Sequence, residues 1–180
     1  MGVADQLTVA RIAATPLVVI LFIWNFPTHA YWATAVFIAA MATDQIDGWL
    51  ARRQGRATPL GSLLDPVADK VLVLATMVVL VGEGAFPGWM VAAIVARELL
   101  VSGLRLAAVE RGVILQARDL GKLKTWSQAV AVAIGGFAVA GAWSTSFAWW
   151  ALLVAVVLTW ISGLGYARDA PALLRRRALA

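Results

Sequence analysis

Long apolar runs alternate with short polar or glycine- and proline-containing breaks along the chain. Each run approaches the roughly 20 residues that an α-helix needs to cross the hydrocarbon core of a bilayer. The pattern predicts an all-α integral membrane protein, with one domain over residues 1–180 and six transmembrane helices. We expect these helices at about residues 7–26, 31–53, 60–81, 89–110, 122–142 and 147–167.

The composition supports a membrane protein over a soluble one. Hydrophobic residues make up 62% of the 180 positions and charged residues only 14%, whereas soluble domains are about half apolar and a quarter charged. Disordered, collagen-like and coiled-coil classes are excluded on the same ground. The chain has no cysteine, which excludes disulfides, thiolate zinc sites and cysteine nucleophiles.

The positive charges are sorted between the two sides of the predicted bundle. Basic residues follow the second, fourth and sixth predicted helices, whereas the alternate loops carry only His29 and Glu83. By the positive-inside rule, both termini are cytoplasmic. Membrane topology thus accounts for the net charge of +5, and we expect no nucleic-acid partner. The cationic tail, residues 166–180, either lies on an anionic leaflet or is solvated.

Four of the ten acidic residues lie close together in the sequence. Asp44 and Asp47 share a face at the cytoplasmic end of the second predicted helix, and Asp65 and Asp69 share one at the start of the third. Antiparallel neighbours would bring all four carboxylates to one depth, where they repel unless neutralised. Oxygen ligands without His or Cys indicate one or two Mg²⁺ or Mn²⁺ ions. The alternative is that the acids only pair with neighbouring basic residues.

Small residues flank these acids. Gly48 lets a ligand approach the helix backbone, Ala51 lies one turn beyond Asp47, and Gly61 lies one turn before Asp65. Arg52 is placed to pair with a phosphate or with the acids themselves. Metal ions, an arginine and a glycine-lined cleft together indicate a pyrophosphate-bearing nucleotide at the membrane surface.

Residues 44–69 fit the pattern D-x2-D-G-x2-A-R-x8-G-x3-D-x3-D at every fixed position. This stretch resembles the signature of the CDP-alcohol phosphatidyltransferases. The resemblance implies a fold of six transmembrane helices and direct displacement without a covalent intermediate. It also implies metal ligands and nucleotide contacts within the signature, with Asp69 as the catalytic base. The implied metal ligands are Asp44, Asp47, Asp65 and Asp69, and the implied nucleotide contacts are Asp44, Gly48, Ala51, Arg52 and Gly61.

Three further segments, at residues 7–16, 97–105 and 121–128, resemble the bacterial branch of this family that makes phosphatidylglycerophosphate. The opening departs from that branch, with Ala4-Asp5 where Pro-Asn is usual. The resemblance implies transfer of a phosphatidyl group from CDP-diacylglycerol to glycerol 3-phosphate, releasing CMP. It places the protein in the bacterial inner (cytoplasmic) membrane, with the active site facing the cytoplasm. Gly135 and Gly136 allow close helix packing, and the family often forms homodimers.

Basic residues on and after the fourth predicted helix suit the acceptor. We expect them to form a cationic pocket for the phosphate of glycerol 3-phosphate. The members of this pocket are Arg97, Arg105, Arg118, Lys122 and Lys124. The alternative is an Arg97–Glu98 packing contact, with the other charges serving topology.

Three other functions stay open on the sequence alone. A sister enzyme would use inositol phosphate, serine or phosphatidylglycerol as the acceptor. A small cation transporter would use the four acids as its ion site. An inactive relative would bind lipid or nucleotide without turning it over.

Overall fold

The computed structural model describes residues 3–24, 26–54, 59–110 and 119–175. Within helices it gives only the backbone, and not the side chains, of residues 3–10, 44–54, 59–67, 69, 109–110, 119–120 and 165–175. The described residues form six helices and no strand. The helices are α1 (Val3–Ile23), α2 (His29–Gln54), α3 (Pro59–Gly82), α4 (Gly88–Glu110), α5 (Asp119–Val139) and α6 (Thr145–Arg175).

These bounds confirm the all-α class and the six predicted helices, with shifts at several ends. The largest shift is at α6, which continues to Arg175 instead of ending near residue 167. Hydropathy limits only the part of a helix that fits the hydrocarbon, about 20 residues. A helix continues beyond that part wherever its backbone hydrogen bonds are still made. The cationic tail is thus largely a continuation of α6, although its side chains are not described.

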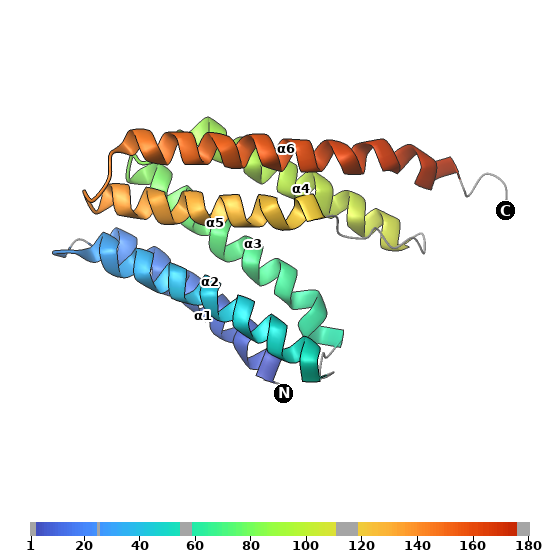
Figure 1. The fold of residues 1–180 in the computed structure, drawn as a ribbon, viewed down its shortest axis with the longest axis horizontal. Coiled ribbons are helices and arrows are strands. Elements are labelled where there is room, and N and C mark those ends of the chain that lie inside the picture. The colour runs from blue at the N-terminus through green and yellow to red at the C-terminus, as the bar shows by residue number, and fades with distance from the viewer. Residues whose placement is uncertain (1–2, 25, 55–58, 111–118, 176–180) are drawn as a thin grey trace.

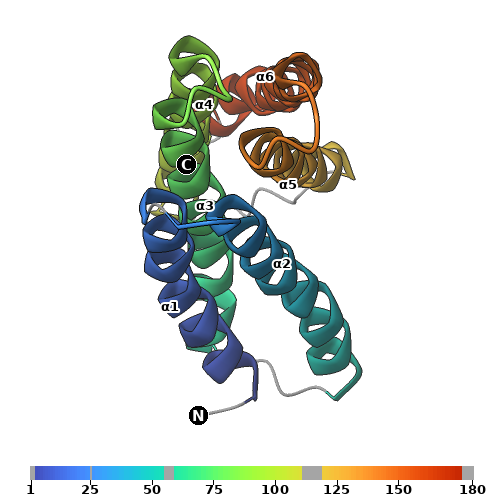
Figure 2. The same cartoon turned by 90° about the vertical axis from the view of Figure 1, so that its left-hand side faces the viewer.

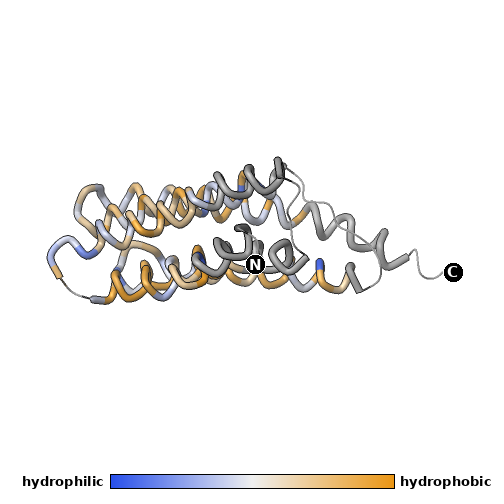
Figure 3. The backbone as a smooth tube through the Cα atoms, turned by 90° about the horizontal axis from the view of Figure 1, so that it is seen from below, coloured by the Kyte–Doolittle hydropathy of each residue, from blue (hydrophilic) through white to orange (hydrophobic). Residues whose placement is uncertain are grey.

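Among the described residues, one helix is both long enough and apolar enough to cross a membrane. It is α6, through its segment Thr145–Leu164. Two further apolar stretches, Arg11–Ile23 and Lys70–Gly82, are shorter than a full span. Hydrophobic residues nevertheless run along the described length of the bundle (Figure 3). Many large apolar side chains are exposed on its outside, among them Leu17, Val78 and Leu99.

The six helices form two groups joined by α3. Helix α1 packs against both α2 and α3, while α6 packs against α4 and α5. Helix α3 also contacts α4 and α5, so it links the groups, and α2 reaches α5 (Figures 1 and 2). The apolar core follows these contacts, and its largest fully buried side chains include Phe22, Phe37 and Met77.

Tight glycine turns close two of the connections at the end of the bundle where α2, α4 and α6 begin. Gly84 and Gly141 have φ angles of 75° and 76°. In each turn the glycine and the next residue donate backbone hydrogen bonds to the end of the preceding helix, as in a Schellman motif. Trp32, Trp89 and Trp143 lie at this end and are exposed. The aromatic residues therefore gather at the end predicted to face away from the cytoplasm.

The predicted close packing at the glycine pair of α5 occurs inside the chain. A Cβ atom on Gly135 would lie 2.7 Å from the ring of Phe86. A Cβ atom on Gly136 would collide with the side chain of Thr34 on α2. The space beside both glycines is thus filled by side chains of the same copy of the protein.

Candidate functional site

The signature segment lies at one turn of the helical bundle. Asp44 and Asp47 belong to the last part of α2, and Asp65 and Asp69 to the first half of α3. Helix α2 ends at Gln54 and α3 begins at Pro59, so the two acidic segments are tied by a short connection. The side chains of these four aspartates lie outside the described part of the structure. Their convergence on a metal ion stays a prediction.

For the other signature residues, too, the structure gives only the backbone. Gly48, Ala51 and Arg52 lie on α2 and Gly61 on α3, and their side-chain surroundings are also not described. Arg118 lies outside the described residues altogether. No three His, Cys, Asp or Glu side chains that the structure does describe could hold a metal together. The metal prediction therefore rests on the four signature aspartates.

The best-defined polar site in the described region is centred on Glu98, in the middle of α4. Its side chain is only 3% exposed. One carboxylate oxygen accepts hydrogen bonds from Arg97 Nη1 at 3.2 Å, from Lys124 Nζ at 2.5 Å and from Gln128 Nε2 at 3.3 Å. The other oxygen lies 3.8 Å from Lys70 Nζ. Three helices, α3, α4 and α5, thus bring their polar side chains to one carboxylate.

Helix α6 completes this polar cluster. Arg97 Nη2 donates to Ser162 Oγ at 3.0 Å, and Gln128 Nε2 donates to Thr159 Oγ1 at 2.8 Å. Arg97 passes over Gly163, where an added Cβ would lie 2.9 Å from its Nε. A charged group in an apolar bundle is costly unless it is paired. We call this set of side chains the Glu98 cluster; its members are Glu98, Lys70, Arg97, Lys124, Gln128, Thr159 and Ser162. Within it, the guanidinium of Arg97 is paired with Glu98 on α4 and with Ser162 on α6, which offsets the cost of its burial.

Lys70 is the most accessible cation bonded to this cluster. Its side chain is 35% exposed, against 4% for Arg97 and 9% for Lys124. Its Nζ donates to Ser102 Oγ on α4 at 2.6 Å. Because Lys70 directly follows Asp69, the two residues differ by only ~1.5 Å along the axis of α3. The backbone of the last signature aspartate thus lies next to that of Lys70, whose ammonium group reaches Ser102 and Glu98.

The predicted acceptor residues separate into buried and accessible groups. Arg97 and Lys124 come together at Glu98, both buried. Lys122 is exposed, because residues two apart on a helix point to different faces. Arg105 is partly exposed, and its charge lies close enough to repel that of Lys70. The predicted Arg97–Glu98 contact is present, but it is one part of a larger cluster.

Sequence reasoning named Glu98 and Lys70 only as pairing partners in the alternative interpretations, and it assigned no role to Gln128 or Ser162. An acid in the middle of an apolar helix is the signal that marks Glu98. The spacing of four between Lys124 and Gln128 puts both on one face of α5. Nothing in the sequence pairs that face with Glu98, because the partners come from different helices.

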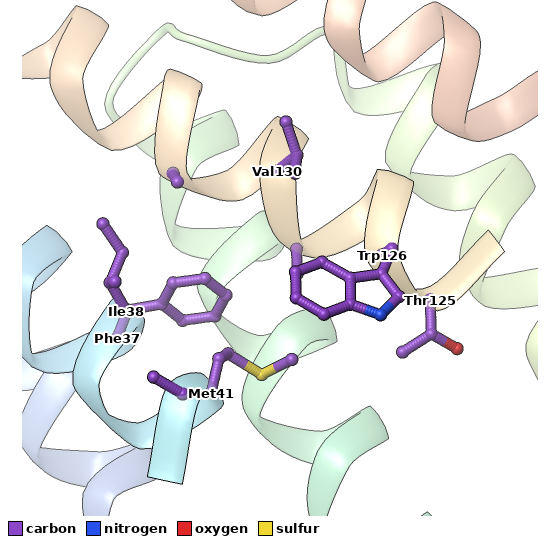
Figure 4. A pocket seen from close by; sticks show the side chains of 9 residues that line it. Phe37, Ile38, Met41, Thr125, Trp126 and Val130 are labelled. Carbon is purple, nitrogen blue, oxygen red and sulfur yellow. The ribbon is translucent and has the colours of Figure 1, made fainter. Parts of the chain in front are cut away.

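An apolar groove lies between α2 and α5 (Figure 4). It has a volume of about 260 Å³. It is lined by Phe37, Ile38, Met41, Ala42, Thr125, Trp126, Ala129, Val130 and Ala133. One end lies at Ala42, two residues before Asp44, and at Thr125, next to Lys124. The groove thus leads from the apolar surface toward the segments that carry the predicted site.

Comparison with known proteins identifies the family. The family model described as CDP-alcohol phosphatidyltransferase matches residues 1–161. The match includes the signature, the Glu98 cluster except Ser162, and the groove.

Individual relatives are similar over most of the chain. A protein of Bacillus subtilis named CDP-diacylglycerol--glycerol-3-phosphate 3-phosphatidyltransferase is 38% identical over 90% of this chain and 91% of its own length. A Mycobacterium tuberculosis protein named probable phosphatidylglycerophosphate synthase is 37% identical over 92% of this chain and 79% of its own. A rice protein named cardiolipin synthase (CMP-forming) is 38% identical, over 71% of this chain and 43% of its own.

Proposed function

Because the chain belongs to the CDP-alcohol phosphatidyltransferase family, we propose that it transfers a phosphatidyl group from CDP-diacylglycerol to glycerol 3-phosphate. The products are phosphatidylglycerophosphate and CMP. The observation that carries this proposal is the similarity to proteins named for this reaction, which extends over about nine-tenths of the chain. The complete signature favours an active transferase over an inactive relative or a cation transporter.

The signature aspartates suit a hard divalent cation, because carboxylates are the oxygen donors that Mg²⁺ and Mn²⁺ prefer. Asp44, Asp47, Asp65 and Asp69 would hold one or two such ions. When bound, the ions neutralise the pyrophosphate of the donor and polarise the phosphorus that bears the diacylglycerol. Gly48, Ala51, Arg52 and Gly61 line the nucleotide side in this proposal.

Asp69 is our candidate for the general base. It accepts the proton of the glycerol 3-phosphate 1-hydroxyl as that oxygen attacks the phosphorus. CMP leaves as the new phosphodiester bond forms, so no enzyme nucleophile is needed. The proximity of Asp69 to the cationic Glu98 cluster along α3 supports this assignment, because it places the base near a site for an anionic acceptor.

The acceptor phosphate needs positive charge. We assign direct contact to Arg105, Arg118 and Lys122. Arg97 and Lys124 are buried and bonded to Glu98, so they act through the positive potential they add.

The groove between α2 and α5 gives the donor lipid an apolar surface beside this site. Its lining is almost entirely hydrocarbon. We place one acyl chain of CDP-diacylglycerol there, so that the pyrophosphate reaches the signature segment while the tails stay in the bilayer.

The test is CMP release by the purified protein in detergent, with CDP-diacylglycerol, Mg²⁺ and one acceptor at a time. We expect release with glycerol 3-phosphate and its loss on chelation. Release only with phosphatidylglycerol would instead support the second candidate, a cardiolipin synthase, which the rice relative favours. No release with any acceptor from folded protein would refute both.

We also propose six membrane spans in the bacterial inner membrane, with both termini and the site on the cytoplasmic side. The absence of cysteine from the chain allows single-cysteine labelling in cells. Glu83→Cys and Ser144→Cys should react with a membrane-impermeant maleimide, and Gln116→Cys only after permeabilisation. Labelling of Gln116→Cys in intact cells would refute this topology. We further propose that two copies form a homodimer, as is frequent in the family. The mass of the protein in nanodiscs should then equal two copies, and a mass of one copy would refute the dimer.

A further inference from the structure

We propose that Lys70 binds the phosphate of the acceptor directly, and that Ser102 and Glu98 position it for this contact. This inference rests on the proposed function, because it names a group of the proposed acceptor. Sequence reasoning placed the acceptor phosphate entirely on residues of α4 and later segments. The structure adds a cation from α3, next to the proposed base.

The geometry around Lys70 supports a binding role. Its ammonium is held by Ser102 at 2.6 Å and faces the Glu98 carboxylate at the longer distance of 3.8 Å. Arg97 and Lys124 make their shorter contacts to the other oxygen of this carboxylate, so Lys70 does not compete with them for the same oxygen. Lys70 is therefore anchored at the edge of the cluster, with a third of its side chain still accessible.

The charge balance of the cluster favours an anion. Among the described side chains, three cations, Lys70, Arg97 and Lys124, surround the one carboxylate of Glu98. Positive charges held together at partial burial repel one another. A phosphate at the accessible edge, between Lys70 and Arg105, relieves that repulsion and gains charge-assisted hydrogen bonds.

The position of Lys70 assigns it to the acceptor instead of the donor pyrophosphate. Its ammonium turns toward α4, as the bonds to Ser102 and Glu98 show. Arg105, which we assign to the acceptor, lies on the same helix as Ser102, three residues further on. An acceptor phosphate held by Lys70 and Arg105 would lie beside the segment of α3 that carries Asp69. In glycerol 3-phosphate the attacking 1-hydroxyl is only three carbons from the phosphate, so this position would keep the hydroxyl near Asp69.

The experiment compares initial rates of CMP release for wild type and four variants, with each substrate varied in turn. Lys70→Gln removes the charge but keeps a side chain that can bond to Ser102. Lys70→Arg restores the charge. Ser102→Ala removes the anchor, and Ser127→Ala is its matched control, because Ser127 donates only to a carbonyl of its own helix in the described structure.

We expect Lys70→Gln to raise KM for glycerol 3-phosphate by ~10-fold or more, the effect of one lost charge-assisted hydrogen bond. KM for CDP-diacylglycerol should stay within about twofold, as expected for a contact made only to the acceptor. Lys70→Arg should recover most of the loss. Ser102→Ala should raise the acceptor KM by ~3-fold to 10-fold through loss of one hydrogen bond, and Ser127→Ala should not. Competitive inhibition by inorganic phosphate should weaken in parallel in Lys70→Gln.

The proposal is overturned if Lys70→Gln leaves the acceptor KM unchanged, or if it raises the donor KM instead. A fall in kcat alone would also overturn it. If Lys70→Gln does not accumulate as folded protein, the pair Ser102→Ala and Ser127→Ala decides by the same criterion. Failure of the proposed function is distinguished by the wild type, which would then not use glycerol 3-phosphate at all.

Discussion

Gly163 on α6 makes room for the buried arginine of the Glu98 cluster. An added Cβ would lie 2.9 Å from Arg97 Nε and 3.4 Å from its Cγ. Both atoms lie near the middle of a side chain whose far end is held by Glu98 and Ser162. Gly163→Ala therefore forces Arg97 to move away from at least one of these partners.

The expected loss of stability follows from two opposing effects. Replacing glycine by alanine inside a helix stabilises it by ~1 kcal/mol. A hydrogen bond to a charged group contributes ~1.5–3 kcal/mol, and displacement of Arg97 weakens one or two of them. We expect a net destabilisation of ~2 kcal/mol, which lowers the unfolding midpoint of a chain of this size by ~4–8 °C.

The matched control is Gly103→Ala. Gly103 also lies inside a helix, and a Cβ added there meets nothing within 4 Å. This variant gains the helix propensity without a clash, so its midpoint should rise by ~2–4 °C. Thermal unfolding in one detergent, followed by circular dichroism, measures both variants under the same conditions.

One result would refute this reasoning. If Gly163→Ala is as stable as Gly103→Ala, the Arg97 side chain has another position of equal energy. The buried contacts to Glu98 and Ser162 would then not be the reason that α6 carries a glycine at this point.

Three further predictions concern the site and the lipid. Asp69→Asn should abolish CMP release while leaving binding of CDP-diacylglycerol largely intact, and unchanged turnover would contradict its role as base. Ala133→Phe should fill part of the groove between α2 and α5 and raise KM for long-chain CDP-diacylglycerol by several-fold. Ala92→Phe, at an exposed position on α4, is its control, and equal effects of both would remove the acyl chain from the groove. Glu98→Gln should destabilise the fold by ~3–5 kcal/mol, measured by thermal unfolding, because it leaves buried cations unpaired.

The helices themselves follow closely from the sequence. The length of each apolar run predicts a helix without reference to its neighbours. The bounds of α3 and α4 accordingly differ from the prediction by one residue at each displaced end. The end of α6 was misplaced because apolar length carries no information about a helix that continues past its apolar segment.

The signature could also be found in the sequence, because its residues lie within one short stretch whose spacing is itself the evidence. The sequence could not show, however, which basic residues are buried and which are exposed. Lys122 and Lys124 have the same charge and are neighbours in the sequence, yet one is exposed and the other is bonded to Glu98. Helical periodicity says that they point to different faces, but not which face meets another helix.

What the sequence determined by itself is local: six helices, the loops in which positive charge gathers, and the complete family signature. The tertiary structure decided which groups share one environment. It brought Lys70, Arg97 and Lys124 from three helices to Glu98, and it left Lys70 the most accessible of the three. The physical reason is that burial and pairing of a charge depend on which helix faces pack together, and that choice is made by the whole bundle.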